Sequence, residues 1–386
     1  MSGHSPDPSL PYEHRAVGAG AHRSLRSPSP CWVVTDGRAG IENQALGLAE
    51  AVSRLIPLSI TVKRVHLARP LNWLPTAFAP ASLARTARGS DVLDVPTPEL
   101  WIGCGRQAAL FSIAARRRAT PPFVVQLQNP RAPLDRFDLV LPPAHDGVSG
   151  PNVVPLIGSP NRITEAGVAA AASRLSARVL PRAGGRTVIG FVIGGPNRVF
   201  PFDRQDADRL ASAIRDVSDS GAYPIITLSR RSPPWLTDVV RKAAPADAVI
   251  YAPSSEPGLC NAGPSEKEAS GKEASGKDVL GEEAGELTAD ENPYPGLLGL
   301  ASSVVITNDS VNMIGEALTA GARVLAFPLK PSRQGPNKFT AFLDSLIQRD
   351  LVRFYSKEDI GEWRPDRLDE TARAAREIVE RLRARQ

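Results

Sequence analysis

Polar residues that follow the apolar run VVIT have the types needed to bind a phosphorylated ligand. Asn308, Asp309 and Ser310 come first, and Ser310 can cap a helix whose free N–H groups would face a phosphate. Glu316 follows in the same helical pattern, where a carboxylate can accept hydrogen bonds from two ribose hydroxyls. We therefore predict a nucleotide-binding segment that comprises Asp309, Ser310, Asn312 and Glu316.

Two earlier segments could complete the same site. The turn GGPN follows the apolar run TVIGFVI, and its glycines are expected to leave backbone N–H groups free for a phosphate. The segment SRR ends the run YPIITL, and its two guanidiniums are expected to meet a diphosphate; a solvated basic turn is the alternative. The residues predicted here to bind the nucleotide sugar are Gly194, Gly195, Asn197, Ser229, Arg230 and Arg231.

Three loops of the N-terminal half have similar positions after apolar runs. The first, TDGRAGIENQ, forms a tight polar turn before a helix that is expected to begin near Asn43. The second, IGCGRQ, has the same pattern of glycines before a helix. The third, VQLQN, ends in amides that suit a polyhydroxylated ligand. Packing turns are the alternative for each. The residues predicted to line a cleft in this half, which the family resemblance given below implies is the acceptor side, are Gly37, Arg38, Gly40, Asn43, Gln44, Gly105, Arg106, Gln107, Gln128 and Asn129.

His145 is a candidate general base from its own chemistry, and Asp36 is a candidate in the transfer reaction that the family resemblance given below implies. Asp36 ends the first apolar run, and His145 lies beside Asp146 in the loop PPAHDG. Histidine titrates near neutral pH, although a single loop histidine is more often incidental. Neither half has the glycine spacing of a dinucleotide-binding fingerprint, which excludes a dehydrogenase.

Short apolar runs alternate with helical patterns along the chain and would position these loops. Such alternation predicts an α/β protein with two Rossmann-like, doubly wound domains that face a cleft, and ligands of these folds lie beyond the carboxyl ends of the strands. NVVPLI at 152–157 is among the expected strands, and a helix containing Val168 and Leu175 is expected to close the first half. The predicted divisions are a disordered tail at 1–29, a first Rossmann-like domain at 30–180, a second at 181–355 with a flexible insertion at 253–291, and a C-terminal helix at 356–386. The family resemblance given below implies that the first domain holds the acceptor and the second the nucleotide sugar.

Composition limits the choice of partners and compartment. The net charge of +5 is mild and does not indicate a nucleic-acid partner. The three cysteines are scattered without metal-ligand spacing, so we expect neither a metal nor a cofactor. No secretory signal or long apolar run is present, which favours a cytoplasmic protein. The uncharged segment Pro70–Ala84 fits either an acceptor-lipid or inner-membrane-face contact, or a buried connection.

The motifs together resemble the bacterial branch of the mitochondrial-fission (elongated-mitochondria) protein family. The resemblance rests on TDGRAGIENQALGLAEA, WIGCGRQAA, QLQNPR, FDLVLPPAHDG, GGPN, SRR, ENPYPGLL and TNDSVNMIGEAL, from about Trp32 to about Tyr355. The second half more distantly resembles GT-B glycosyltransferases, in which a serine and a glutamate six residues apart hold the diphosphate and ribose. Ser310 and Glu316 match that form. The repeat EKEAS–GKEAS and the long N-terminal segment depart from the family pattern.

The resemblance implies a metal-independent glycosyltransferase of the GT-B type. Its donor would be a nucleotide-diphosphate sugar, its acceptor is unspecified, and Arg230, Arg231 and helix N-termini would stabilise the departing diphosphate. Two alternatives stay open. One is a non-catalytic adaptor that keeps the fold, as the plant member of the family is implicated to be, and the other is a nucleotide-sugar epimerase.

Overall fold

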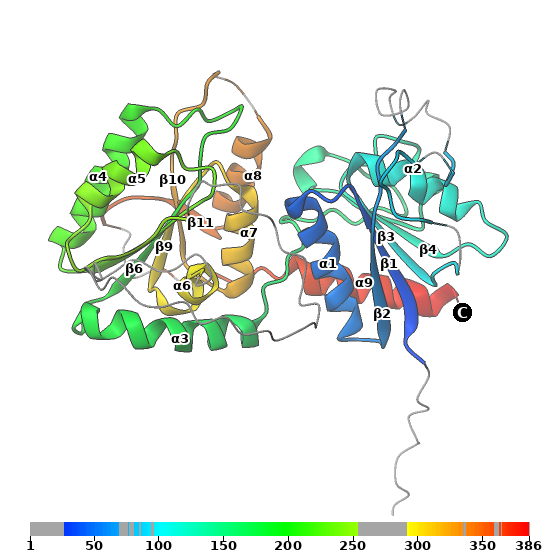
Figure 1. The fold of residues 1–386 in the computed structure, drawn as a ribbon, viewed down its shortest axis with the longest axis horizontal. Coiled ribbons are helices and arrows are strands. Elements are labelled where there is room, and N and C mark those ends of the chain that lie inside the picture. Colours follow the sequence, from blue (N-terminus) through cyan, green and yellow to red (C-terminus); the bar gives the residue numbers. More distant parts are fainter. Residues whose placement is uncertain are drawn as a thin grey trace, which may run out of the picture.

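The structure is a computed structural model that describes residues 27–68, 76, 81–84, 86–93, 96–253, 292–333, 335, 337–358, 363 and 365–385. Most of the predicted tail, most of the segment Pro70–Ala84 and most of the predicted insertion lie outside these residues, while Ser29, the last residue of the predicted tail, begins the first strand. The described chain forms two α/β bodies side by side (Figure 1). Each is built around a parallel sheet, so the prediction of two Rossmann-like domains is confirmed as a fold class.

The first sheet has the strand order β2-β1-β3-β4-β5, and every pair is parallel. Helix α1 covers one face and helix α2 the other, so the central strands are buried on both sides and consist of apolar runs. The strand order reverses between β1 and β3. The strands are β1 (Ser29–Thr35), β2 (Leu58–Arg64), β3 (Leu100–Cys104), β4 (Phe123–Leu127) and β5 (Leu139–Leu141), and the helices are α1 (Ala39–Ser53) and α2 (Gly105–Arg116).

The second sheet has the order β11-β10-β9-β6-β7-β8, again all parallel. This order reverses between β6 and β9, which is where open α/β sheets bind ligands. The strands are β6 (Val188–Ile193), β7 (Tyr223–Leu228), β8 (Val249–Tyr251), β9 (Ser303–Thr307), β10 (Val324–Phe327) and β11 (Val352–Phe354). Helices α3 (Glu165–Ala183), α6 (Tyr294–Leu300), α7 (Val311–Ala320) and α8 (Lys338–Ile347) cover one face, and α4 (Arg204–Asp219) and α5 (Pro234–Ala243) the other.

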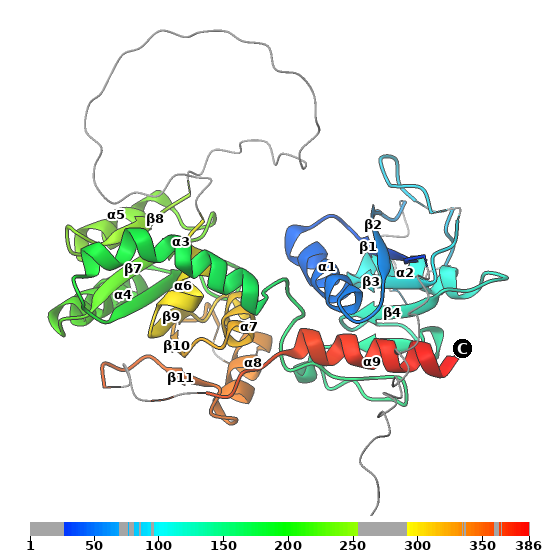
Figure 2. The ribbon, with the colours of Figure 1, turned by 90° about the horizontal axis from the view of Figure 1, so that it is seen from below.

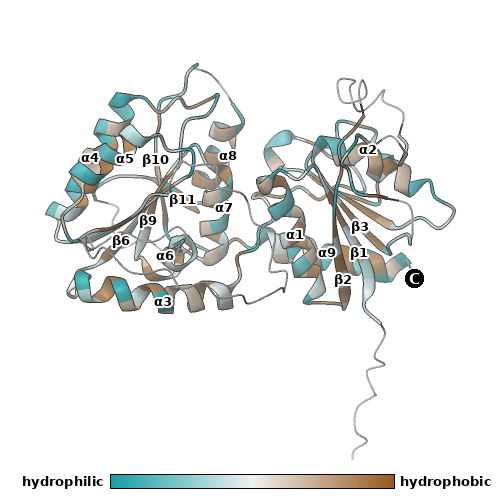
Figure 3. Ribbon diagram, viewed as in Figure 1, coloured by the Kyte–Doolittle hydropathy of each residue, from teal (hydrophilic) through white to brown (hydrophobic). Residues whose placement is uncertain are grey.

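Apolar residues concentrate in the strands and on the inward sides of the helices, as the hydropathy colouring shows (Figure 3). This distribution gives each sheet an apolar cluster on each of its two faces. Of the helices in the described part of the chain, none has both the length and the apolar character needed to cross a bilayer.

Three predicted elements differ from the structure. Residues 152–157 form isolated bridges at Val153 and Leu156, because Pro155 lacks an N–H group and so cannot donate to a ladder. Helix α1 begins at Ala39, four residues earlier than expected, so the DGR turn leads directly into it. Helix α3 packs on α6 of the second sheet instead of closing the first half; a Cβ added at Gly296 of α6 would lie 2.7 Å from the Ala171 carbonyl oxygen, so glycine permits this close approach.

The C-terminal helix α9 (Glu370–Arg385) returns to the first sheet and lies beside α1 (Figure 2). Its apolar face, which includes Ala374 and Ile378, is buried in the same cluster as α1. The chain therefore crosses between the two sheets twice. The crossings are joined where the Asn161 N–H donates to Thr371 Oγ1 (3.0 Å) and the Ile157 N–H donates to the Glu370 carboxylate (2.7 Å).

Candidate functional site

A buried carboxylate organises the strand ends at the reversal point of the second sheet. Asp309, which follows β9, is 3% exposed and accepts hydrogen bonds from Thr307 Oγ1 (2.7 Å) and from the Gly195 N–H (3.2 Å). A Cβ added at Gly194 would lie 2.1 Å from Asp309 Oδ1, so no side chain fits there. Burial raises the pKa of Asp309 above its ordinary value, although its hydrogen bonds with Thr307 and Arg231 act in the opposite direction.

The two glycine N–H groups are not free for a phosphate, contrary to the sequence prediction. The Gly194 N–H donates to Thr307 Oγ1 (2.8 Å), while the Gly195 N–H is held by Asp309. Asn197 is also committed to the turn, since its Oδ1 accepts the Val199 N–H (2.8 Å). The GGPN segment therefore holds neighbouring loops in place through its backbone and is not itself an anion cradle.

Arg231 joins the loop after β7 to this carboxylate. Its guanidinium lies 3.2 Å from Asp309 Oδ2 and donates to the Gly195 carbonyl (3.2 Å), while half of the side chain stays exposed. Ser229 shapes the turn by accepting the Arg231 N–H (3.2 Å), and the Arg230 side chain is exposed. The loops after β6, β7 and β9 thus converge as predicted, with Arg231 already partly neutralised.

Further cations lie on loops at the same edge of the sheet. The loop after β10 is tied to the loop after β6 where the Ser332 N–H donates to the Val199 carbonyl (2.7 Å). Arg198, Lys330 and Arg333 are exposed on these two loops. Together with Arg230 they give the strand ends of the second sheet a positive rim that suits an anionic ligand.

Helix α7 begins at this rim with the cap that the sequence predicts. Ser310 accepts the Met313 N–H (3.4 Å), and the first N–H groups of the helix, at Val311 and Asn312, have no acceptor within α7 itself. These groups lie directly after β9, at the strand ends where the loops described above converge. A phosphate placed there would gain both the helix dipole and the free donors.

Glu316 faces a small crevice between α7 and α1. The crevice has a volume of about 50 Å³, and its walls are formed by Gly40, Asn43, Gln44, Ser159, Pro160, Asn161, Asn312 and Glu316. Burial raises the pKa of Glu316, and a hydrogen bond with Tyr294 partly offsets this effect. Tyr294 belongs to the ENPYPG motif, for which no role was predicted. A tyrosine at the start of a helix gave no signal that its hydroxyl would reach α7.

A row of amides crosses from the first sheet to α7. Gln128 Nε2 donates to Gln44 Oε1 (3.0 Å), and Gln44 Nε2 lies 3.5 Å from Asn312 Oδ1. Gln128 has a φ of 66°, a left-handed conformation that is unusual for a residue other than glycine. These three predicted residues are therefore brought together. Asn129 instead accepts the Arg131 N–H (2.9 Å) within its own turn.

The loop after β1 places Asp36 in an ion pair with its neighbour. Both carboxylate oxygens accept hydrogen bonds from Arg38, one from the backbone N–H (3.3 Å) and one from Nε (2.9 Å), and the side chain is buried. Gly37 and Gly105 both have positive φ, as tight turns require. Gln107 is used structurally, since it accepts the Leu67 N–H (3.0 Å), and Arg106 is exposed.

His145 packs between the two bodies and does not line the crevice. Its ring meets Phe342 of α8 edge-on, with 6.2 Å between ring centroids, and Nε2 lies 3.8 Å from Asp146. Burial lowers the pKa of His145, and the nearby Lys338 lowers it further, while Asp146 acts in the opposite direction. The geometry gives this side chain a packing position between a loop of the first body and a helix of the second.

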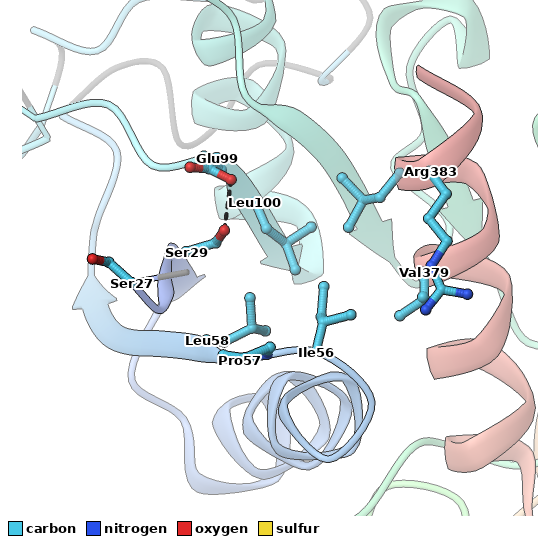
Figure 4. A pocket seen from close by; sticks show the side chains of 10 residues that line it. Ser27, Ser29, Ile56, Pro57, Leu58, Glu99, Leu100, Val379 and Arg383 are labelled. Carbon is cyan, nitrogen blue, oxygen red and sulfur yellow. Dashed lines mark hydrogen bonds between the residues drawn. The ribbon is translucent and has the colours of Figure 1, made fainter. Parts of the chain in front are cut away.

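A larger hollow lies at the opposite edge of the first sheet, beside α9 (Figure 4). It has a volume of about 240 Å³, and Ile56, Leu58, Leu100 and Val379 contribute to its apolar walls. The Ser29 hydroxyl in this hollow already donates to the Glu99 carboxylate (2.7 Å), so it is not free to donate to a ligand. Within the described ranges, no three His, Cys, Asp or Glu side chains gather in a way that could hold a metal ion.

Comparison with known proteins adds a family and distant structural likenesses. An uncharacterised protein of Rickettsia prowazekii (strain Madrid E) is 24% identical over 84% of this chain and 90% of its own length. The mitochondrial fission protein ELM1 of Arabidopsis thaliana is 26% identical over 75% of this chain and 65% of its own length.

Among solved structures, the glycosyltransferase SnogD of Streptomyces nogalater matches 92% of this chain and 95% of its own, with 13% identity and a TM-score of 0.42. The UDP-GlcNAc 2-epimerase of Neisseria meningitidis bound to UDP-GlcNAc matches 92% and 100%, with 11% identity and a TM-score of 0.43. The model of the mitochondrial fission ELM1 family matches residues 39–261 and 274–382, which is most of the sequence. The chain therefore belongs to the mitochondrial fission ELM1 family.

Proposed function

We propose that this protein binds a nucleotide-diphosphate sugar at the strand ends of its second sheet and transfers the sugar to an acceptor held by the first. The observation that carries the proposal is the convergence of three strand-end loops on one edge, where Arg231, the N-terminus of α7 and Glu316 lie at the point of strand reversal.

The donor side is supported by charge and by the direction of α7. The diphosphate would lie against the first N–H groups of α7 and the exposed Arg230, within reach of the half-exposed Arg231. Glu316 would accept the ribose hydroxyls. The Gly194 and Gly195 N–H groups are left out of this proposal because the protein already uses them.

The transfer itself would be a displacement at the anomeric carbon of the sugar. The bond from this carbon to the diphosphate oxygen breaks, a bond to an acceptor hydroxyl oxygen forms, and the acceptor proton passes to a base. Asp36, on the loop between β1 and α1, is the base candidate, but it can take a proton only after Arg38 releases it. The Arg38 side chain is 69% exposed and so has room to turn away. Catalysis would then rest on positioning and on stabilisation of the leaving diphosphate.

The first test is binding. We expect nucleotide-diphosphate sugars from a panel of bases to raise the melting temperature of the protein, and Glu316→Ala to abolish that shift. Glu165→Ala is the matched control, because Glu165 is 83% exposed at the start of α3 and should leave the shift unchanged. A full shift in the Glu316 variant would contradict the proposed site.

The second test is turnover, which separates transfer from a non-catalytic adaptor role. The adaptor alternative is favoured by the size of the crevice, because about 50 Å³ is well below the roughly 300 Å³ of a typical small-molecule site. Binding without product across plausible acceptors would favour the adaptor. A strict requirement for a divalent metal would contradict the arginine-based mechanism.

A further inference from the structure

Three amide side chains form a row between the two bodies, where α1 faces α7 (Figure 1). They come from three separate segments, because Gln128 follows β4, Gln44 lies on α1 and Asn312 lies in the first turn of α7. Gln128 Nε2 donates to Gln44 Oε1 (3.0 Å), whereas Gln44 Nε2 is 3.5 Å from Asn312 Oδ1, at the long limit of a hydrogen bond. The row is therefore tight within the first body and loose between the bodies.

Gln128 has a backbone conformation that its residue type disfavours. Its φ is 66°, and the backbone is fixed there because the Gln128 N–H donates to the Leu141 carbonyl at the end of β5 (3.0 Å). Glycine would adopt this conformation without steric cost, but it would carry no amide. Strained backbone of this kind collects at functional sites, and here it coincides with a polar side chain directed at α1. The coincidence indicates that the Gln128 amide serves a ligand.

The row has hydrogen-bonding groups to spare. Within the described part of the chain, Gln128 Oε1 and Asn312 Nδ2 have no hydrogen-bond partner. Gln44 and Asn312 also line the crevice, to which the exposed Asn43 contributes a further amide. Each amide offers donors and an acceptor without a charge, and a sugar hydroxyl likewise both donates and accepts. The chemistry of the row therefore matches a polyhydroxylated ligand.

We propose that Gln44 and Gln128 bind hydroxyl groups of the transferred sugar, and that in the free protein the row of amides takes the place of that sugar. This inference rests on the proposed function and adds the residues that recognise the sugar, as distinct from the nucleotide. The diphosphate would lie at the first turn of α7, so a sugar joined to it lies beside Asn312, next to the Gln44 amide. Entry of the sugar breaks only the loose contact between Gln44 and Asn312. Its hydroxyls then replace the amide partners, an exchange that conserves the number of hydrogen bonds.

A purely structural role for the row predicts a different result. If Gln44 only held the two bodies together, its loss would change the affinity for a nucleoside diphosphate and for the corresponding nucleotide sugar by the same factor. If Gln44 and Gln128 bind the sugar, their loss should weaken binding of the nucleotide sugar alone. The ratio of the two dissociation constants therefore separates these roles.

The experiment measures these dissociation constants by isothermal titration calorimetry. The probes are UDP-, ADP-, GDP- and dTDP-glucose and the corresponding four nucleoside diphosphates, and the pair with the highest affinity is used for the variants. Gln44→Met keeps the length of the side chain and removes its amide. We expect this variant to raise the ratio of the nucleotide-glucose constant to the nucleoside-diphosphate constant about 3- to 10-fold, as the loss of one hydrogen bond would.

Gln128→Gly tests the same site through the strained residue. The variant removes the amide and also relieves the left-handed backbone, so its melting temperature should equal or exceed that of the wild type. The ratio of dissociation constants should nevertheless rise by a similar factor. A stable variant with weakened sugar binding is not expected if Gln128 serves only the fold. This variant also keeps the inference testable if Gln44→Met fails to fold.

Gln348→Met is the matched control, because Gln348 is exposed at the C-terminal end of α8 and its side chain should not affect the ratio. An unchanged ratio in either folded variant, or an equal change of both dissociation constants, would overturn the inference. A melting temperature of Gln128→Gly well below that of the wild type would also contradict it. Failure of the wild-type protein to bind any of the eight probes would instead overturn the proposed function.

Discussion

Replacing Asp309 tests whether the strand-end loops depend on one carboxylate. Asp309 is the common acceptor for the loop after β6 and the loop after β7, through the Gly195 N–H and the Arg231 guanidinium. Asp309→Ala removes both links, whereas Asp309→Asn keeps the shape of the side chain and one acceptor oxygen. The two variants therefore separate the packing of the side chain from its charge.

The expected loss of folding stability depends on which hydrogen-bonding groups around Asp309 keep a partner. The half-exposed Arg231 can be hydrated, and Thr307 still accepts the Gly194 N–H. Asp309→Ala nevertheless leaves two buried donors unpaired, the Gly195 N–H and the Thr307 hydroxyl. An unpaired buried donor costs about 1 to 3 kcal/mol, and the removed side-chain atoms add a packing loss. The raised pKa of Asp309 shows that burial of its charge is itself unfavourable, which offsets part of this. We expect a loss of about 3 kcal/mol for the alanine variant and about 1 kcal/mol for the asparagine variant.

Urea unfolding monitored by circular dichroism at pH 7 measures these losses, with binding of UDP-glucose measured on the same samples. The matched control is Asp135→Ala, because Asp135 is 77% exposed and lies 3.8 Å from Arg136, and its removal should change stability by less than about 0.5 kcal/mol. We expect both Asp309 variants to bind the nucleotide more weakly, since Arg231 loses its anchor. An asparagine variant as unstable as the alanine variant would show that the charge matters more than the packing. An alanine variant as stable as the wild type would refute the reasoning altogether.

Three further predictions concern other parts of the site. The raised pKa values of Asp309 and Glu316 mean that the folded state holds protons that the unfolded state releases, so the free energy of unfolding should fall as pH rises from about 4 through the raised values. Glu316→Gln should make this pH dependence less steep in urea titrations. A pH dependence as steep as that of the wild type would contradict the prediction. A Cβ added at Gly40 would lie 3.5 Å from Asn312 Nδ2, so Gly40→Leu should push α1 away from α7 and increase the radius of gyration measured by solution scattering. Gly40→Ala should leave the radius of gyration unchanged. His145→Ala should destabilise the protein by about 1 to 2 kcal/mol in thermal unfolding and leave nucleotide binding intact, because His145 packs on Phe342. Unchanged stability would contradict this packing role, and lost turnover with intact binding would indicate a general base.

The alternation of apolar runs and helical patterns was sufficient to predict the two parallel sheets. The apolar runs of β6 and β9 are buried on both faces, and such continuous runs are typical of central strands in a parallel sheet. The exact elements depended on contacts that sequence does not show. Helix α3 has an ordinary amphipathic pattern, which does not show which sheet it covers. It packs on the second sheet, where Gly296 and Gly299 of α6 permit its close approach.

The candidate site was predictable where a residue acts through its position after a strand. Ser310 caps α7 as expected, and Arg231 meets the loop after β6. The prediction failed for the glycine N–H groups because their acceptors, Thr307 and Asp309, come from a strand more than a hundred residues away. Tyr294 was missed for the same reason, since its partner lies on a different helix and its own segment has no polar pattern.

The size of the crevice, set against the strength of its contacts, indicates how a nucleotide sugar would enter. Where α1 meets α7, the contact is made by uncharged groups, and Gln44 Nε2 lies 3.5 Å from Asn312 Oδ1. Glycine also occurs at this contact, since a Cβ added at Gly315 of α7 would lie 3.9 Å from the Ser159 nitrogen. At the two chain crossings, by contrast, buried hydrogen bonds join Asn161 to Thr371 and the Ile157 N–H to Glu370. Separation is therefore easier at the crevice than at the crossings. A ligand of several hundred Å³ would be admitted by rotation of the two bodies about these crossings, which would carry Glu316 and the N-terminus of α7 away from α1 and close them again over the bound diphosphate.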